Sequence, residues 1–273
     1  MANKKIYQIY YDERTRRELN ENFIPLDNRR SGDTGWYEFL PIHRFLSANT
    51  LEEDHWYGFL SPKFTSKTKC DAAYVHGFLD RLPADAEVAI FSPGWDQLCY
   101  FQNPWEQGEI WHPSVSEATQ KFLIHTGRFA DLHRLVTDVT TSVFSNYLIA
   151  KKRFWLEWKA IADDLLAFIA SHAEYDGLLT SYGSLSNKAP MKAFIQERLA
   201  SYVLATSQFK TVASTVTHQP PIFRRIFPDG EKDRKLFSLC DHFKRKYLET
   251  KDPAYFHAYK STRKLIHFKP PYL

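Results

Sequence analysis

The sequence predicts an α/β fold in which helices flank a sheet of short strands. Three observations support this fold class. The chain has 273 residues, of which 44% are apolar, so it can bury a sizeable core. Short apolar segments alternate with longer segments whose apolar residues recur at helical spacing. Two of the short segments end in Ser-Pro and enclose a helical pattern, which is the strand–helix–strand order of a parallel sheet.

The individual elements follow from periodicity and turn residues. The first strand, at 5–11, is aromatic and β-branched and ends at an Asp-Glu pair. Residues 20–35 concentrate Asn, Asp, Gly and Pro, which predicts a loop long enough to bind a ligand. Further strands are predicted at 56–60, 87–91 and 142–150, and helices at 36–46, 71–82, 151–170, 191–205 and 236–248.

Several classes of protein are excluded by what the sequence lacks. It has no run of eighteen apolar residues and no apolar segment typical of a signal peptide near its start, so we expect a cytoplasmic protein. The three cysteines, Cys70, Cys99 and Cys240, are far apart and are predicted to be free thiols. The GxGxxG, GxxxxGK[ST] and GxSxG motifs are absent, which argues against a dinucleotide-binding dehydrogenase, a P-loop enzyme and an α/β-hydrolase.

The positive charge is concentrated in the C-terminal part of the chain. From residue 221 to the end there are thirteen Lys and Arg against six Asp and Glu, whereas the whole chain has a net charge of +4. We therefore expect a main domain at 1–219 and a basic, mostly helical extension at 220–273 that packs on it.

Polar residues follow the strand predicted at 87–91. Ser92, Asp96 and Gln97 come directly after it, and ligands of open α/β sheets bind at the carboxyl ends of strands. Asp96 is a candidate to meet a ribose hydroxyl or a divalent cation held by a diphosphate. The alternative is that Asp96 caps the helix that begins near Gln97.

A charge pair interrupts the apolar helix predicted at 191–205. Glu197 is a candidate general base, and Arg198 is the guanidinium beside it. The alternative is a salt bridge that only stabilises the helix, and structural ion pairs are more common than catalytic carboxylates.

Four segments, taken in order, resemble GT-A-like glycosyltransferases of bacterial capsule and lipopolysaccharide gene clusters. The resemblance spans roughly residues 5 to 205. The segments that carry it are Leu26-Asp27-Asn28 followed by Tyr37-Glu38, Asn49 ahead of the run 56–64, the run 145–151 leading into Phe154-Trp155 and Trp158, and Glu197-Arg198-Leu199.

The resemblance implies a role for each matching residue. Asp27, Asn28 and Glu38 would bind the nucleotide, and Glu197 would be the catalytic base. Asn146 and Trp155 would line the acceptor side. Ser92, Asp96, Gln97 and Arg198 would bind the rest of the nucleotide sugar, with Asp96 as the ligand of a Mg²⁺ or Mn²⁺ ion. The chain departs from the family pattern because it has no DxD pair, which puts metal dependence in doubt.

The expected function is therefore transfer of a sugar from a nucleotide-sugar donor to a hydroxyl of a surface-polysaccharide or lipid-linked saccharide acceptor. The C-terminal extension would then attach peripherally to anionic lipid at the inner face of the cell membrane. The alternative is a nucleic-acid-binding module, which the absence of RRM, KH, zinc-finger and helix-turn-helix signatures disfavours. It would use Arg224, Arg225, Lys232, Arg234, Lys235, Lys244, Arg245 and Lys246 for phosphates and Tyr247, Phe256 and Tyr259 for stacking.

Overall fold

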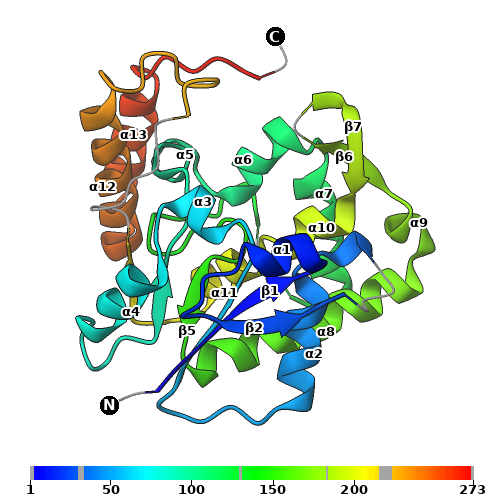
Figure 1. Ribbon diagram of the computed structural model, residues 1–273. Helices are drawn as coiled ribbons and strands as arrows, with labels where there is room; N and C mark the ends of the chain where they lie inside the picture. Colours follow the sequence, from blue (N-terminus) through cyan, green and yellow to red (C-terminus); the bar gives the residue numbers. More distant parts are fainter. Residues whose placement is uncertain (1–2, 30–33, 129–130, 183, 215–222, 272–273) are drawn as a thin grey trace.

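A computed structural model describes residues 3–29, 34–128, 131–182, 184–214 and 223–271 (Figure 1). Its centre is a six-stranded sheet in the order β2-β1-β3-β5-β4-β8. The strands of this sheet are β1 (Lys4–Tyr10), β2 (Ile24–Asp27), β3 (Trp56–Leu60), β4 (Val88–Ile90), β5 (Leu148–Ala150) and β8 (Thr211–Ala213). The predicted α/β class is thus confirmed.

The sheet is mixed. β1 pairs in parallel with β2 on one side and with β3 on the other, and β4 pairs in parallel with β8. β5 is antiparallel to both of its neighbours and lies between β3 and β4. The two strands that end in Ser-Pro are therefore parallel to each other, as predicted, but they are not neighbours in the sheet.

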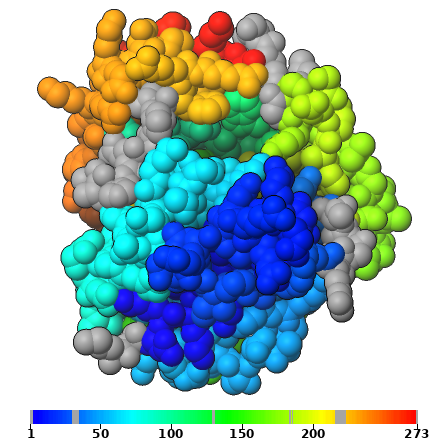
Figure 2. Space-filling view, in the orientation of Figure 1, coloured from blue at the N-terminus to red at the C-terminus, as the bar shows by residue number. Residues whose placement is uncertain are grey.

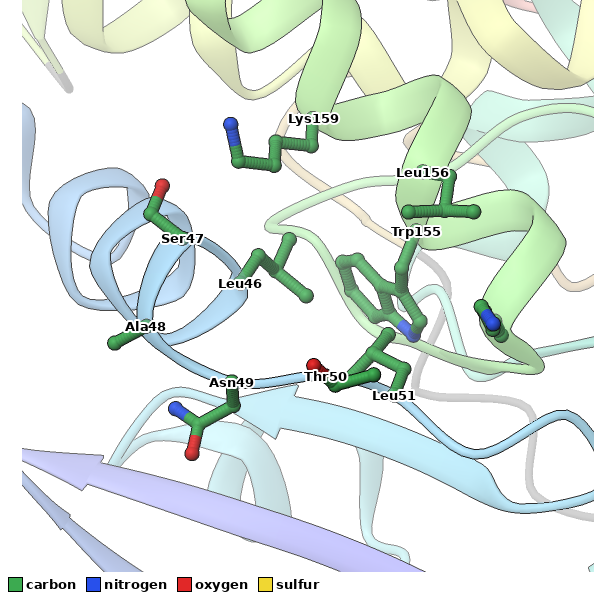
Figure 3. A pocket seen from close by; sticks show the side chains of 10 residues that line it. Leu46, Ser47, Ala48, Asn49, Thr50, Leu51, Trp155, Leu156 and Lys159 are labelled. Carbon is green, nitrogen blue, oxygen red and sulfur yellow. The ribbon is translucent and has the colours of Figure 1, made fainter.

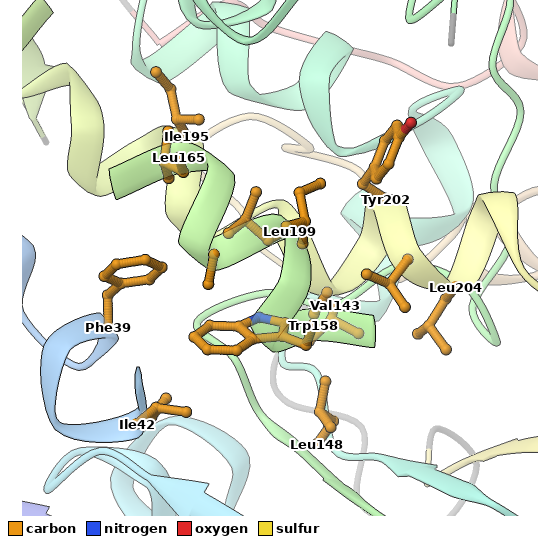
Figure 4. Close-up of a cluster of buried hydrophobic side chains, with 14 of the residues drawn as sticks. Phe39, Ile42, Val143, Leu148, Trp158, Leu165, Ile195, Leu199, Tyr202 and Leu204 are labelled. Carbon is orange, nitrogen blue, oxygen red and sulfur yellow. The ribbon is translucent and has the colours of Figure 1, made fainter. Parts of the chain in front are cut away.

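Both faces of the sheet are buried because side chains along each strand alternate between two cores. Tyr57 and Phe59 of β3 face the larger core, which contains helices α2 (Phe39–Ala48), α7 (Val115–His125), α8 (Lys152–Ser171), α10 (Met191–Gln196) and α11 (Leu199–Thr206). Trp56 and Leu60 face the other core, with α3 (Phe64–Thr68) and α4 (Ala72–Asp80). In the larger core Trp158 of α8 lies among side chains from α2, α11 and β5 (Figure 4).

Several segments differ from the sequence prediction. β2 lies inside the predicted loop 20–35, and only 148–150 of the predicted strand 142–150 are extended. The helix predicted at 191–205 is two helices, α10 and α11, with Glu197 and Arg198 at the break. The helix expected near Gln97 is α5 (Trp95–Tyr100), and α1 (Glu13–Arg17) lies in the charged segment after the first strand. Elements without a predicted counterpart include α3, α7, η1 (Thr34–Trp36), α6 (Pro104–Trp111), α9 (Ala173–Asp176) and the hairpin of β6 (Leu179–Tyr182) with β7 (Ser184–Pro190).

The C-terminal part of the chain is helical, as predicted. Helices α12 (Arg234–Thr250) and α13 (Pro253–Arg263) pack on each other, and α12 packs on α5. Phe227, Phe237 and Tyr259 share a third core with residues 98–101 of the main domain. The boundary expected between 219 and 220 lies outside the described residues.

The strand order places a switch point between β1 and β3. The chain runs from β1 to β2 on one side and then returns to β3 on the other, so the connections leave the sheet in opposite directions at this point. Ligands of open α/β sheets bind at such a point, beyond the carboxyl ends of the strands. Here those ends carry Tyr11 after β1 and Ser61 after β3, and Asn146 and Tyr147 lead into the antiparallel β5 at the same edge.

Candidate functional site

A cleft of about 380 Å³ opens at this edge of the sheet. In the space-filling view the surface is hollowed between the cyan segment around α3 and the green segment around α6 (Figure 2). The cleft combines charged, amide and aromatic side chains from α3, α5, α6 and the α10–α11 break. Its lining residues are Lys67, Pro93, Gly94, Gln97, Gln107, His112, Phe144, Ser145, Glu197, Arg198 and Phe223.

Glu197 is the carboxylate of this cleft, and the helix break places it there. α10 ends at Gln196 and α11 begins at Leu199, so Glu197 is the C-cap residue that follows α10 and is not part of a continuous helical stripe. About 35% of its side chain is exposed, whereas the residues on both sides of it are buried. The carboxylate is therefore reachable from the cleft.

The surroundings of Glu197 favour its protonated form. Burial raises the pKa of the carboxyl group, and the nearby Glu38 carboxylate adds to the increase. Arg198 and Lys67 act in the opposite direction, and the nearest guanidinium nitrogen, Nη1 of Arg198, is 4.0 Å from Oε2. A carboxylate with a raised pKa and no hydrogen-bond donor from the described part of the chain is a suitable proton acceptor.

Arg198 is held rigidly at the base of the cleft. Its Nε donates to the Pro104 carbonyl at 3.0 Å, and its Nη1 donates to the Phe194 carbonyl at 2.7 Å. A Cβ added at Gly108 would lie 2.5 Å from Nη2, so only glycine leaves room for the guanidinium. Arg198 thus adds a fixed positive charge to the cleft. Gln97 also lines the cleft, and its Oε1 accepts a hydrogen bond from Gln107 at 2.9 Å.

The backbone ahead of β5 is strained where it borders the cleft. Ser145 and Asn146 have φ values of 57° and 55°, and two successive residues other than glycine in this region are costly. Asn146 donates to Gln196 Oε1 at 3.0 Å, but its own Oδ1 is buried and has no hydrogen-bond partner. A strained backbone beside an unsatisfied buried acceptor is typical of a functional site.

Glu38 begins α2 on the same side of the sheet. It lies close to the buried Tyr11 hydroxyl, whose pKa is raised by burial first and then by the Glu38 charge. The charge of Glu38 also reaches Tyr147 and Glu197. The structure therefore brings three of the predicted site residues together in the cleft lining, Gln97, Glu197 and Arg198, and places Glu38 close enough for its charge to act on Glu197.

Asp96 and Ser92 have roles other than those expected. Asp96 is 2% exposed, and its two carboxylate oxygens accept from the backbone N–H groups of Gln97 at 3.0 Å and Phe223 at 2.6 Å. Ser92 accepts from Phe144 N at 2.9 Å and donates to the Ser142 carbonyl at 3.2 Å. Both side chains tether loops, and neither lines the cleft. Asp96 does not cap α5 as the alternative interpretation expected, because it lies inside the helix and the N-cap is Gly94. The structure gives the diphosphate role expected for Ser92 and Asp96 no support.

Asp96 does not fit the role of a metal ligand either, because backbone N–H groups already occupy both of its oxygens. The described residues also contain no group of three His, Cys, Asp or Glu side chains arranged to hold a metal ion.

Asp27 and Asn28 lie at the correct edge of the sheet but outside the cleft lining. Asp27 ends the edge strand β2, and its carboxylate binds the Arg29 side chain at 2.7 Å, which holds the pKa of the carboxyl well below its usual range. Asn28 continues the strand pairing by donating from its backbone to the Tyr10 carbonyl at 2.9 Å. The structure therefore does not join these two residues to Glu197.

Trp155 was expected on the acceptor side, but it does not line the cleft that contains Glu197. Its indole is 1% exposed, packs against Phe59, and donates to the Tyr57 carbonyl at 3.0 Å. It also forms the floor of a second hollow, of about 350 Å³, between the end of α2 and the start of α8 (Figure 3). α2 is about 15 Å long and separates this hollow from the Glu38 end of the helix.

The C-terminal basic residues are largely engaged within the protein. Lys244 is fully buried and donates to the carbonyls of Leu98 at 2.7 Å and Phe101 at 2.8 Å. Tyr259 is also fully buried, so it cannot stack on a base as the nucleic-acid alternative requires. Other basic residues of the C-terminal region form ion pairs or hydrogen bonds with polar side chains: Arg245 with Asp241, Lys246 with Glu249, Arg234 with Glu231, Lys260 with Gln102, and Arg263 with Glu106.

Two residues of the cleft were missed by the sequence analysis. Lys67 donates to Ser145 Oγ at 3.3 Å and lies over the Tyr147 ring. The sequence signal that could have revealed Lys67 is its spacing of four residues from Lys63, which places both lysines on one side of a helix. His112 lies at the end of α6 and binds the Ser181 carbonyl, which is far away in the sequence. No local pattern could have revealed that contact.

No family model, curated protein or solved structure matches this chain. Among the described residues, no helix combines the length and apolar character needed to cross a bilayer. The function is therefore inferred from the residues and geometry of the cleft.

Proposed function

We propose that the protein is a glycosyltransferase that moves a sugar from a nucleotide-sugar donor to a hydroxyl of a saccharide acceptor. The observation that carries the proposal is the position of Glu197. It is a partly exposed carboxylate with a raised pKa, in a cleft beyond the carboxyl ends of β3 and β4. The GT-A resemblance of the sequence supports the same class of activity.

Glu197 has the properties that the transfer step requires. The acceptor hydroxyl attacks the anomeric carbon of the donor sugar, the bond from that carbon to the diphosphate breaks, and the hydroxyl proton passes to a base. Glu197 accepts this proton because its carboxylate has no competing hydrogen bonds from described residues and its pKa is raised toward the working pH. Glu38 keeps the pKa raised through its own charge.

Lys67 and Arg198 supply positive charge for the leaving diphosphate. The guanidinium of Arg198 already donates to two backbone carbonyls, so it contributes a fixed field. Lys67 is on the exposed side of α3, and its hydrogen bond to Ser145 is long, at 3.3 Å, so its ammonium can move to a phosphate oxygen. Positive charge that is already in place stabilises the leaving group as negative charge develops on it.

Asn146 fits the acceptor side of the cleft, as the resemblance implies. Its unpartnered Oδ1 could accept a hydrogen bond from a hydroxyl of the acceptor. We also propose that the acceptor is a surface-polysaccharide or lipid-linked saccharide, and that the protein works in the cytoplasm near the inner membrane face. Exposed C-terminal cations that are suited to anionic lipid include Lys232, Lys235, Lys251 and Lys264.

The direct test is a thermal-shift screen with UDP-, GDP-, CMP- and dTDP-sugars, each with and without Mn²⁺. A donor at a hundredfold its Kd stabilises the folded protein by about 2.7 kcal/mol, which raises the melting temperature by roughly 5 °C or more. We expect one nucleotide series to give this shift. Release of the nucleoside diphosphate in the presence of saccharide acceptors then measures turnover, and the paired assays with Mn²⁺ decide metal dependence.

A single-stranded oligonucleotide is included in the screen to test the alternative function. A shift with the oligonucleotide and none with any nucleotide sugar would contradict the glycosyltransferase proposal and favour nucleic-acid binding. If a nucleotide sugar raises the melting temperature but no acceptor leads to diphosphate release, the protein binds nucleotide sugars without transferring them. That result would contradict the catalytic role of Glu197.

A further inference from the structure

His112 is a cleft residue to which neither the resemblance nor the proposed transfer step assigns a role. It follows α6 and lines the same cleft as Glu197. Its Nδ1 is 2.7 Å from the Ser181 carbonyl oxygen. Because a carbonyl oxygen can only accept a hydrogen bond, Nδ1 carries the proton.

The ring is neutral, which determines the state of its other nitrogen. Burial, together with the positive charge of Arg198, lowers the pKa of His112 to about 3. A neutral imidazole has one ring proton, and here that proton is on Nδ1, so Nε2 is an acceptor. No described residue donates a hydrogen bond to Nε2.

Two packing contacts fix the orientation of the ring. The imidazole stacks on Phe194 of α10, with ring centroids 3.5 Å apart. The next residue, Pro113, accepts a hydrogen bond from Thr180 Oγ1 of β6 at 3.1 Å. The hairpin β6–β7 and α10 thus hold His112 from two sides, and its acceptor nitrogen is preorganised for a ligand.

The surroundings of His112 suit a sugar. Phe144 and Phe223 offer aromatic surface, and Gln97 and Ser145 add groups that both donate and accept hydrogen bonds. A pyranose presents hydroxyl groups at its rim and apolar C–H groups on its faces, which match these two kinds of surface.

We propose that Nε2 of His112 accepts a hydrogen bond from a hydroxyl of the sugar bound in the cleft, which makes His112 a specificity-determining residue. The inference rests on the proposed function, because the sugar is the group transferred or the group that receives it. The inference also gives different roles to two side chains of the same cleft, Glu197 and His112. Glu197 takes a proton during the reaction, whereas His112 recognises a hydroxyl that keeps its proton.

Two substitutions distinguish this role from a structural one. In His112→Asn the side-chain amide can still donate to the Ser181 carbonyl, but no acceptor remains at the Nε2 position. In His112→Gln the longer side chain places an amide oxygen near the Nε2 position. Melting temperatures of both variants report whether the contact with Ser181 and the packing on Phe194 survive.

The test uses saturation-transfer NMR of the full chain with glucose, galactose, mannose and N-acetylglucosamine. We expect at least one of these sugars to bind the wild-type protein. Binding should weaken about tenfold in His112→Asn, which corresponds to one lost hydrogen bond, and His112→Gln should retain most of it. Equal binding by wild type and His112→Asn, or no binding of any sugar by the wild type, would overturn the inference.

A second measurement on the wild-type protein needs no variant. In ¹⁵N-labelled protein the resonance of the unprotonated Nε2 should move when the binding sugar is added, whereas that of Nδ1 should stay. An Nε2 resonance that does not respond would overturn the inference even if both variants fail to fold. The nucleotide thermal-shift screen decides the proposed function separately, so a protein that binds nucleotides but no free sugar loses only the role of His112.

Discussion

The cleft and the α12–α13 region contain similar residue types but differ in the partners of their main polar groups. In the C-terminal region the buried ammonium of Lys244 donates to two carbonyls, and the buried Tyr259 hydroxyl donates to the Tyr100 carbonyl at 2.8 Å. In the cleft, Glu197 and His112 Nε2 have no hydrogen-bond donor from the described part of the chain, and beside the cleft the same holds for Asn146 Oδ1. Asp233 Oδ2 and Arg245 Nε of the C-terminal region are also buried without a hydrogen-bond partner among the described residues, so a missing partner marks a ligand site only where the group also lines a cleft.

Two carboxylates illustrate this difference most clearly. Burial raises the pKa of both Asp96 and Glu197. Asp96, on α5 beside the C-terminal helices, uses both of its oxygens to bind backbone N–H groups, whereas Glu197 faces open space. A perturbed pKa alone therefore does not identify a catalytic residue, and the hydrogen-bond partners decide between the two roles.

The largest effect is expected at Glu197. Glu197→Gln should lower kcat by about 10² to 10⁴, because the amide cannot accept the proton of the acceptor hydroxyl, and donor binding should change little. The measurement is diphosphate release with the donor found in the thermal-shift screen. Glu117→Gln, at a carboxylate 66% exposed on α7, is the matched control and should have wild-type turnover. Near-normal kcat in Glu197→Gln would contradict the assignment and direct attention to Glu38.

The next largest effect is expected at Lys244. Lys244→Met removes the donor to two buried carbonyls and should lower the free energy of unfolding by about 3 kcal/mol or more, measured by urea denaturation. Turnover per folded molecule should be unchanged. Lys246→Met, which removes an exposed ion pair with Glu249, should change stability by less than about 0.5 kcal/mol. Equal stabilities of the two variants would contradict the conclusion that the hydrogen bonds of Lys244 stabilise the C-terminal region.

Asp96→Asn should behave as a structural variant. The amide oxygen of asparagine can still accept from one backbone N–H, but its NH2 nitrogen cannot accept from the other, so one of the two N–H groups loses its partner and stability should fall by about 1–3 kcal/mol. Turnover per folded molecule should exceed that of Glu197→Gln by at least tenfold. A variant that keeps its stability but loses turnover would instead support the diphosphate role that the resemblance implies for Asp96.

The smallest predicted effect is a pH-dependent difference in stability. Because the folded pKa of Glu197 is raised above its ordinary value of 4.5, its contribution to stability is fully present below that value and is lost as the pH rises through the folded pKa. Glu197→Gln cannot ionise and avoids this loss. Its melting temperature relative to wild type should therefore increase between pH 4 and pH 8, by roughly 2 °C or more. A difference that is constant with pH would show that burial does not perturb Glu197.

The predictable part of the fold consists of the elements with strong local patterns. β1, β3, β4, α4, α8 and α12 were predicted because their apolar residues recur with the period of a strand or a helix. β2 was missed because Pro25 and Asp27 are typical of a loop, and a strand at the edge of the sheet tolerates proline. α6 had a usable signal, because Asn103 caps it and Pro104 begins it.

The site could be predicted only in part. Glu197 was found because a charge pair interrupts an apolar helical pattern, and Glu38 and Asn146 were found through the resemblance. The burial of Trp155 could have been predicted from its position on the apolar stripe of α8, but the resemblance was given more weight than that pattern. His112 depends on a contact with residue 181, and such long-range contacts leave no trace in local sequence.

The antiparallel β5 has a consequence for synthesis of the chain on the ribosome. Residues 91–147 separate β4 from β5, yet β5 lies between β3 and β4 in the finished sheet. A nascent chain that ends before residue 148 therefore has β3 and β4 without the strand that joins them, and the facing edges of two fully buried strands stay open. Open apolar edges favour aggregation. The N-terminal half of the protein thus depends on its C-terminal half to become a stable sheet.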